Sequence, residues 1–183
     1  SADDLPYEIS PLSDLNGDGK VDLVWRHGSK IEVLSGATGA VISTPALPAN
    51  ASIYANVREG PDFDGDGKRE WVVTDWSDLA GVLGRGALYA LQPVVCSNCS
   101  LATLWSTSNE AGLGQIASPG DLNADGIPDV VVGSPHQGHP TLEIAPGRII
   151  ALNGTAGQRL WEVVGRAGDA TPEQAGYGSQ VQA

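Results

Sequence analysis

The stretch "DLNGDGKVDLVW", residues 14–25, decides the fold, and it shares only part of the pattern of an EF-hand calcium loop. Oxygen-bearing side chains alternate at its first, third and fifth positions, glycine is sixth and a carboxylate is ninth. The twelfth position, where an EF-hand places a bidentate Glu, is Trp25. The stretch is therefore either a degenerate EF-hand or a different kind of loop.

Two more copies of the pattern decide between these alternatives. "DFDGDGKREWVV" begins at Asp62 and "DLNADGIPDVVV" begins at Asp121, and their twelfth positions are Val73 and Val132. Three copies with an apolar twelfth residue are poorly explained by the decay of one EF-hand. Each copy also runs into a short β-branched, apolar run without helical periodicity, which is typical of a buried strand. The sequence predicts a loop between two strands.

The residue types in these loops fit Ca²⁺, which takes six to eight oxygen ligands. The glycine at position six allows the tight backbone path, position seven offers a carbonyl, and the carboxylate at position nine replaces the missing twelfth ligand. The alternative is an Asp/Asn/Gly turn whose side chains bond their own backbone. Three repeated carboxylate clusters favour three calcium sites. The predicted ligands are Asp14, Asn16, Asp18, Asp22 and the carbonyl of Lys20; Asp62, Asp64, Asp66, Glu70 and the carbonyl of Lys68; and Asp121, Asn123, Asp125, Asp129 and the carbonyl of Ile127.

Composition limits the function classes. The 183 residues carry a formal net charge of −12, and ten of the 22 acidic residues lie in the three loops. With only ten Lys and Arg and no basic stripe, nucleic acid is not expected as a partner. No apolar run approaches the roughly 20 residues that span a bilayer, and no signal peptide is visible. We find no nucleophile motif, no HExxH and no phosphate-binding loop, so an enzyme is not expected.

A repeat longer than the loop organises the chain. Each loop is preceded by one short apolar stretch and followed by three more, separated by Gly- and Asn-rich turns. Four strands per unit, repeating at roughly 40–60 residues, predict an all-β fold of propeller blades. Trp105 and Trp161 recur in the fourth strand and are interpreted as core residues. The predicted blades span residues 5–49, 50–109 and 110–168 of a single domain, 1–183, and residues 175–183 would begin a fourth.

The stretch "GLGQIASPGDLNADGIPDVVVGSP", residues 112–135, resembles an FG-GAP repeat, the unit of the integrin α-subunit β-propeller and its relatives. The first two units keep the loop but not its flanks. The resemblance implies a non-catalytic, calcium-stabilised module of a secreted or cell-surface protein, used for adhesion, assembly or binding of a protein or carbohydrate. The alternative is a propeller fragment of an extracellular enzyme, such as a polysaccharide lyase or phospholipase.

Three blades are too few to close a ring, because propellers have about four to eight. "AGYGSQV" at 175–181 repeats "AGLGQIA" at 111–117, and the chain ends just before a fourth loop would open. We therefore expect the remaining blades to come from a longer propeller or from another subunit.

Cys96 and Cys99 lie where a turn between the third and fourth strands of the second blade is predicted. A disulfide closing a small loop is the favoured interpretation, since a redox pair would need a helix N-terminus. Sequons at Asn50, Asn98 and Asn153 matter only if the protein passes through a glycosylating pathway.

Overall fold

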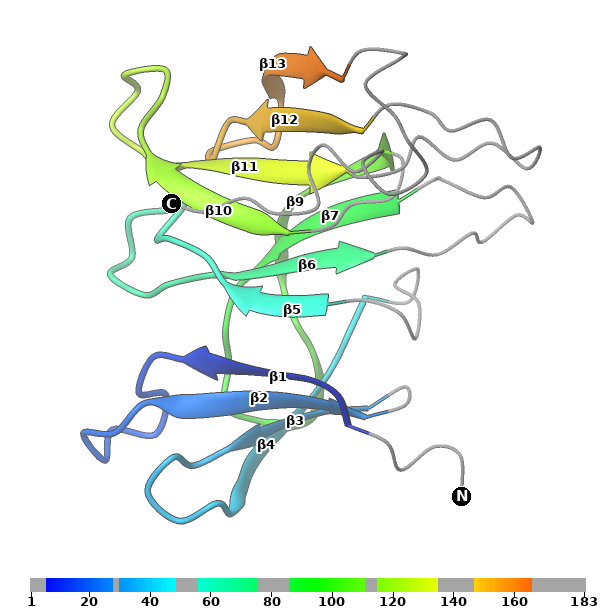
Figure 1. Cartoon of the computed structure of the whole chain (residues 1–183). Helices are drawn as coiled ribbons and strands as arrows, with labels where there is room; N and C mark the ends of the chain where they lie inside the picture. Colours follow the sequence, from blue (N-terminus) through cyan, green and yellow to red (C-terminus); the bar gives the residue numbers. More distant parts are fainter. Residues whose placement is uncertain are drawn as a thin grey trace, which may run out of the picture.

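The computed structural model describes residues 6–27, 30–48, 56–75, 86–110, 115–134 and 147–165. These residues form thirteen β-strands and contain no helix. The predicted first strand of a fourth blade, residues 175–183, lies outside them. The strands form three stacked sheets (Figure 1). The all-β class predicted from the sequence is thus confirmed, and the described sheets do not close into a ring.

Each sheet contains four antiparallel strands, and the first has one extra member. The first sheet has the order β1-β2-β3-β4-β8, from β1 (Pro6–Leu12), β2 (Asp22–His27), β3 (Lys30–Leu34), β4 (Val41–Ala46) and β8 (Ser97–Ser100). The second has β5 (Asn56–Glu59), β6 (Trp71–Asp75), β7 (Gly86–Leu91) and β9 (Thr103–Glu110). The third has β10 (Ile116–Gly120), β11 (Asp129–Ser134), β12 (Arg148–Leu152) and β13 (Arg159–Val164).

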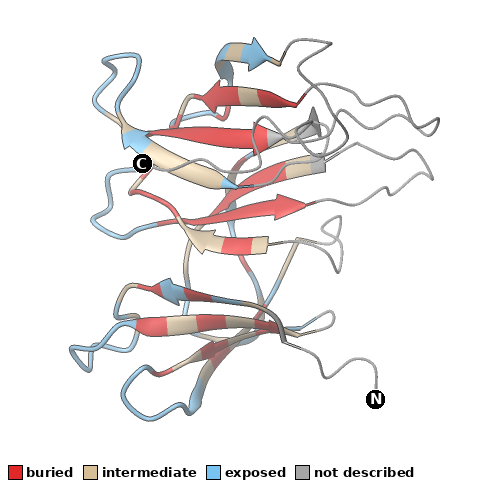
Figure 2. Cartoon of the chain, viewed as in Figure 1, coloured by how far each residue is buried: buried red, intermediate tan, exposed pale blue. Residues whose placement is uncertain are grey.

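The second sheet lies between the other two and is covered on both faces, so every residue of β6 is buried. Side chains of a strand alternate between the faces of its sheet. Trp71 and Val73 therefore pack toward the first sheet, against Val24 and Val33, while Val72 packs toward the third sheet. In Figure 2 the buried residues run along β6 and β7 of this middle sheet and along β11 and β12 of the third sheet.

The second and third sheets share a core built from β6, β7 and β9 on one side and β11 and β12 on the other. Leu88 and Ala90 contribute from the second sheet, and Val132 and Ile150 contribute from the third. Apolar runs predicted as buried strands are thus buried between sheets, where each fully covered Val, Leu or Ile contributes about 1.5–3 kcal/mol.

A polar contact also joins the first and second sheets at β1 and β5. Glu8 pairs with Arg58 at 3.1 Å, and its other carboxylate oxygen accepts a hydrogen bond from the backbone N–H of Val57 at 3.1 Å. Burial raises the pKa of Glu8, and the positive charge of Arg58 opposes that rise. The contact fixes how the two sheets meet at this edge.

Two expectations from the sequence need correction. Trp105 is 7% exposed and belongs to the core, but Trp161 is 42% exposed, because no described strand covers its face of the third sheet. The segment around Cys96 and Cys99 is not a simple turn of the second sheet, since β8 pairs in parallel with β4 and extends the first sheet. Hydrogen bonds of Ser43 with the backbone of Cys96 anchor it there.

All three acidic loops project from the same side of the molecule, at the left of Figure 1, where they connect β1 to β2, β5 to β6 and β10 to β11. The β3–β4 turn and its counterpart between β12 and β13 lie beside the loops of their own sheets. The described residues include no helix of the length and apolar character that a membrane crossing requires.

Candidate metal centre

The carboxylate at position one organises each acidic loop. In the second loop, Asp62 accepts hydrogen bonds from the backbone N–H groups of Gly65 (2.6 Å) and Gly67 (2.9 Å). Asp14 accepts the corresponding bonds in the first loop. In the third loop, Asp121 accepts from the N–H groups of Asp125 and Gly126. The chain therefore coils around this side chain, which turns the side chains of positions three and five inward.

The coil requires a left-handed backbone at positions four and six. Gly17 and Gly65 have φ values of +79° and +77° at position four, and the position-six glycines have φ of +79° to +89°. The third loop has Ala124 at position four with φ of +62°, a conformation that strains a residue with a Cβ. Sequence reasoning identified the requirement at position six but missed the one at position four.

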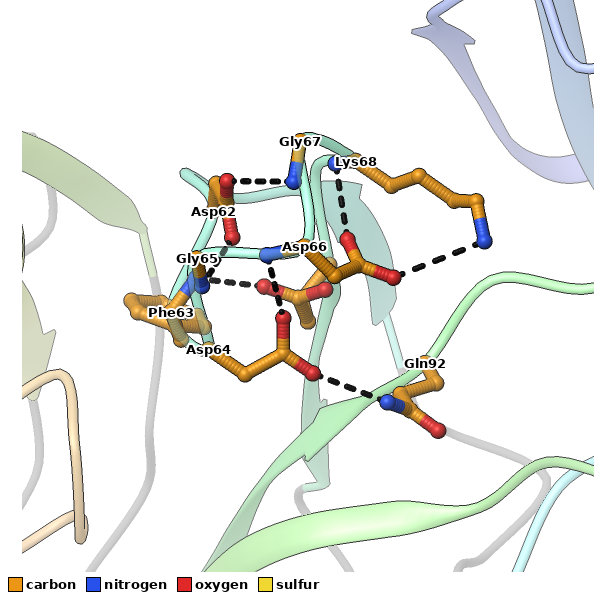
Figure 3. A network of polar contacts seen from close by, with 9 residues as sticks. Asp62, Phe63, Asp64, Gly65, Asp66, Gly67, Lys68 and Gln92 are labelled. Atoms are coloured by element: carbon orange, nitrogen blue, oxygen red, sulfur yellow. Dashed lines mark hydrogen bonds and ion pairs between the residues drawn. The ribbon is translucent and has the colours of Figure 1, made fainter.

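The second loop gathers the densest negative charge. One carboxylate oxygen from each of Asp62, Asp64, Asp66 and Glu70 lies within 4.8 Å of the others, the one such group of acidic, His or Cys side chains among the described residues. Gln92 donates a hydrogen bond to Asp64 at 2.8 Å (Figure 3). The ammonium of Lys68 lies 3.4 Å from Asp66, but its exposure lets solvent screen this pair.

Glu70, at position nine, is fully buried and has an incomplete set of partners. Its Oε2 accepts a hydrogen bond of 2.5 Å from the backbone N–H of Phe63, whereas its buried Oε1 has no hydrogen-bond partner in the described part of the chain. Burial raises the pKa of Glu70; the Phe63 N–H opposes that rise, and the charges of Asp64, Asp62 and Asp66 add to it. A divalent cation would satisfy the free oxygen and offset the repulsion, so these residues fit the predicted ion.

The position-nine residues of the other two loops accept backbone hydrogen bonds with both carboxylate oxygens. Asp22 accepts hydrogen bonds from the N–H groups of Leu15 (2.8 Å) and Gly36 (3.2 Å). Asp129 likewise accepts from Leu122 (2.7 Å) and Gly154 (2.9 Å). Each of these buried carboxylates therefore links its own loop to the turn between the third and fourth strands of its sheet. A carboxylate oxygen has two lone pairs, so both still have capacity for an ion.

Asparagine at position three relieves charge in the first and third loops. The side-chain amide of Asn16 donates to Asp18 at 3.0 Å, and Asn123 donates to Asp125 at 3.0 Å. The pKa of Asp18 is lowered by Asn16 first and the N–H of Lys20 next. That of Asp125 is lowered by the N–H of Ile127 first and Asn123 next. Asp64 has no donor to offer in this position.

The position-seven residues donate backbone N–H bonds of 2.8–2.9 Å to the carboxylate at position five. That their carbonyls bind Ca²⁺ remains a prediction, as does ion binding by the full ligand sets.

A further polar residue, at the end of the third strand of each sheet, contacts the loop of that sheet, and sequence reasoning missed it. Ser35 and Asn153 donate to the position-five carboxylates, and Gln92 donates to position three; each directly follows a leucine that ends a strand.

Cys96 and Cys99 lie at disulfide-bonding distance, with Cα atoms 6.0 Å apart, in agreement with the predicted pairing. Among the sequon residues, Asn98 lies in β8 with φ of +56°, and Asn50 lies outside the described residues. Asn153 already bonds Asp125 at 2.7 Å.

The comparisons with known proteins agree with the repeat proposed from the sequence. Residues 113–147 match the FG-GAP repeat family, which covers β10, the third acidic loop and β11. A search of curated proteins with the chain gave no match. Residues 113–147 are thus an FG-GAP repeat, the family that the sequence resembles.

Proposed function

We propose that this chain is a non-catalytic β-propeller module of a secreted or cell-surface protein, with three blades stabilised by Ca²⁺. In this proposal the three sheets are the blades, at 5–49, 50–109 and 110–168, and β8 reaches from the second blade to the first. The face-to-face stacking of four-stranded sheets and the FG-GAP match over 113–147 support the assignment. FG-GAP repeats are typical of extracellular and cell-surface proteins.

The observation that carries the calcium proposal is Glu70, whose buried Oε1 has no hydrogen-bond partner among the described residues and whose carboxylate belongs to the same cluster as three aspartates of the second loop. Leaving a buried acceptor unsatisfied costs about 1–3 kcal/mol, and like charges add to that cost. A bound Ca²⁺ removes both penalties. The first and third loops would bind through their position-one, -three, -five and -nine side chains, as predicted above.

Calcium in these loops would stabilise the strand pairs that the loops connect. Asp22 and Asp129 already bond the neighbouring turn of their own sheets. An ion bound to these carboxylates would therefore stabilise both the acidic loop and the turn between the third and fourth strands. Extracellular calcium modules bind with dissociation constants of about 10⁻⁴–10⁻³ M. In this proposal the acidic loops stabilise the fold, and a protein or carbohydrate ligand would bind at other surfaces.

Differential scanning calorimetry in calcium and in chelator tests the proposal. At 10–100 times the dissociation constant, a single site adds about 1–3 kcal/mol, which raises the melting temperature of a chain this size by roughly 3–10 °C. Magnesium at the same concentration controls for ionic strength. The Asp64→Asn variant, which gives the second loop the asparagine of the other two, should show a smaller calcium shift. An unchanged melting temperature in the wild-type chain would refute calcium binding.

A further inference from the structure

The second sheet meets the third through a tryptophan seated on a glycine turn. The indole Nε1 of Trp105 donates a hydrogen bond of 2.5 Å to the carbonyl of Gly154, in the turn between β12 and β13. A Cβ at Gly157 would lie 2.4 Å from the Trp105 ring, so the turn accepts the indole only because this residue is glycine. Phe63, from the acidic loop of the second sheet, packs against Trp105 with ring centroids 5.6 Å apart.

The turn between β3 and β4 of the first sheet has the same construction. Gly39 has φ of +70° and Gly157 has +66°, and each donates its N–H to the carbonyl four residues earlier, at 2.7 and 2.8 Å. The second residue of each turn, Gly36 or Gly154, donates to the position-nine carboxylate of its own loop. Yet no atom of the described residues lies within 4 Å of where a Cβ of Gly39 would be. The first sheet therefore has the same glycine turn, but no described indole packs on it.

The third sheet has the equivalent indole, but no described glycine turn packs against it. Trp161 pairs with Ala151 in the sheet register, as Trp105 pairs with Ala90, so the two tryptophans occupy equivalent positions. Trp161 is 42% exposed, and Leu122, which stands where the second loop has Phe63, is also 42% exposed. Val163, two residues along the same face of β13, is 59% exposed. These three side chains form what we call the tryptophan face.

The uncovered face of the first sheet is of the complementary type. Ile9 corresponds in register to Val57 of the second sheet, because each pairs with the residue three positions after the loop's ninth. Val57 is 1% exposed where it meets the preceding sheet, whereas Ile9 is 58% exposed. We call Ile9 and the Ser35–Gly39 turn the glycine-turn face. The two outer sheets of the described residues thus expose the two kinds of surface that pack together between the sheets.

We propose that two copies of this chain associate head to tail, with Trp161 of each copy seated on the Ser35–Gly39 turn of the other. The inference rests on the propeller architecture proposed above. Because the two faces differ, the contact repeats in one direction and produces either a closed ring or a fibre. Two copies supply six of the sheets that the structure describes, a number within the roughly four to eight blades that close a propeller. A second copy buries both faces at once.

Size-exclusion chromatography with light scattering, over a dilution series in calcium, tests the association. The chain should have about twice its mass of 18.9 kDa at high concentration and dissociate on dilution. Trp161→Ser, which places there the residue that the first sheet carries at its equivalent position, Ser43, should weaken association at least about tenfold. Val164→Ser is the matched control, since Val164 is 49% exposed on the same strand but faces the opposite side, and it should leave the mass unchanged.

Mixing variants tests the orientation. Ile9→Lys places a charge on the glycine-turn face and should also give a monomer. A mixture of Ile9→Lys with Trp161→Ser should regain dimer mass, because one intact tryptophan face then meets one intact glycine-turn face. A wild-type monomer at all concentrations, a dimeric Trp161→Ser, or a mixture that stays monomeric would overturn the proposal. A monomer whose melting temperature still rises with calcium would overturn it without affecting the calcium proposal.

Discussion

Glu70→Gln is expected to change the stability of the chain in opposite directions with and without calcium. In chelator, the variant removes the buried charge whose Oε1 has no partner, and the amide can donate a hydrogen bond to the neighbouring aspartates. Satisfying a buried polar position stabilises by about 1–2 kcal/mol, or roughly 2–8 °C in melting temperature for a chain of this length. In calcium, the neutral amide is a weaker ligand, so the variant should lose most of the calcium shift.

The pH dependence of the calcium-free chain provides a second measurement of the same effect. Because the pKa of Glu70 is raised in the folded state, the folded chain binds more protons than the unfolded chain between the ordinary pKa of 4.5 and the folded pKa. Stability should therefore fall as the pH rises through this window. Glu70→Gln should show a shallower fall than the wild-type chain, measured by urea unfolding in chelator.

Asp129→Asn is the matched control at the equivalent position of the third loop. Both oxygens of Asp129 accept backbone N–H bonds, so an amide nitrogen would face a donor and cost about 1–3 kcal/mol. This variant should be destabilised in chelator and in calcium alike. If Glu70→Gln lowers the melting temperature in chelator as Asp129→Asn does, Glu70 is not strained without an ion and the reasoning fails.

Three further predictions follow from individual residues. Asp66→Ala should raise the calcium concentration needed for folding more than Asp18→Ala or Asp125→Ala, because the second loop has four carboxylates; equal shifts in the calcium midpoint would contradict this. Ala124→Gly should stabilise the chain by about 1 kcal/mol in urea unfolding, because it relieves the positive φ, and no gain would mean that the strain is absent. Ser43→Ala should cost about 1–2 kcal/mol and increase hydrogen exchange in β8, since it breaks the buried bonds that hold this strand; unchanged exchange would argue against that role.

The sequence alone determined the features that depend on neighbouring residues. The spacing of Asp62, Asp64 and Asp66 defines a coil that closes within its own residues, and the β-branched valine run of β11 favours a buried strand. Repetition of these short patterns was sufficient to predict the four-stranded units. Such contacts span few residues, so their geometry follows from local backbone chemistry.

Tertiary structure decided the features that join segments far apart in the chain. The pairing of β8 with β4, the seat of Trp105 on Gly154, and the burial of Trp105 but not Trp161 all depend on which sheet packs against which. The unsatisfied Oε1 of Glu70 also depends on tertiary structure. In the first and third sheets, a tight glycine turn donates an N–H to the position-nine carboxylate, whereas the second sheet has the long cysteine segment in place of that turn. Sequence spacing carries no information on these partners, since their approach is fixed by the packing of whole sheets.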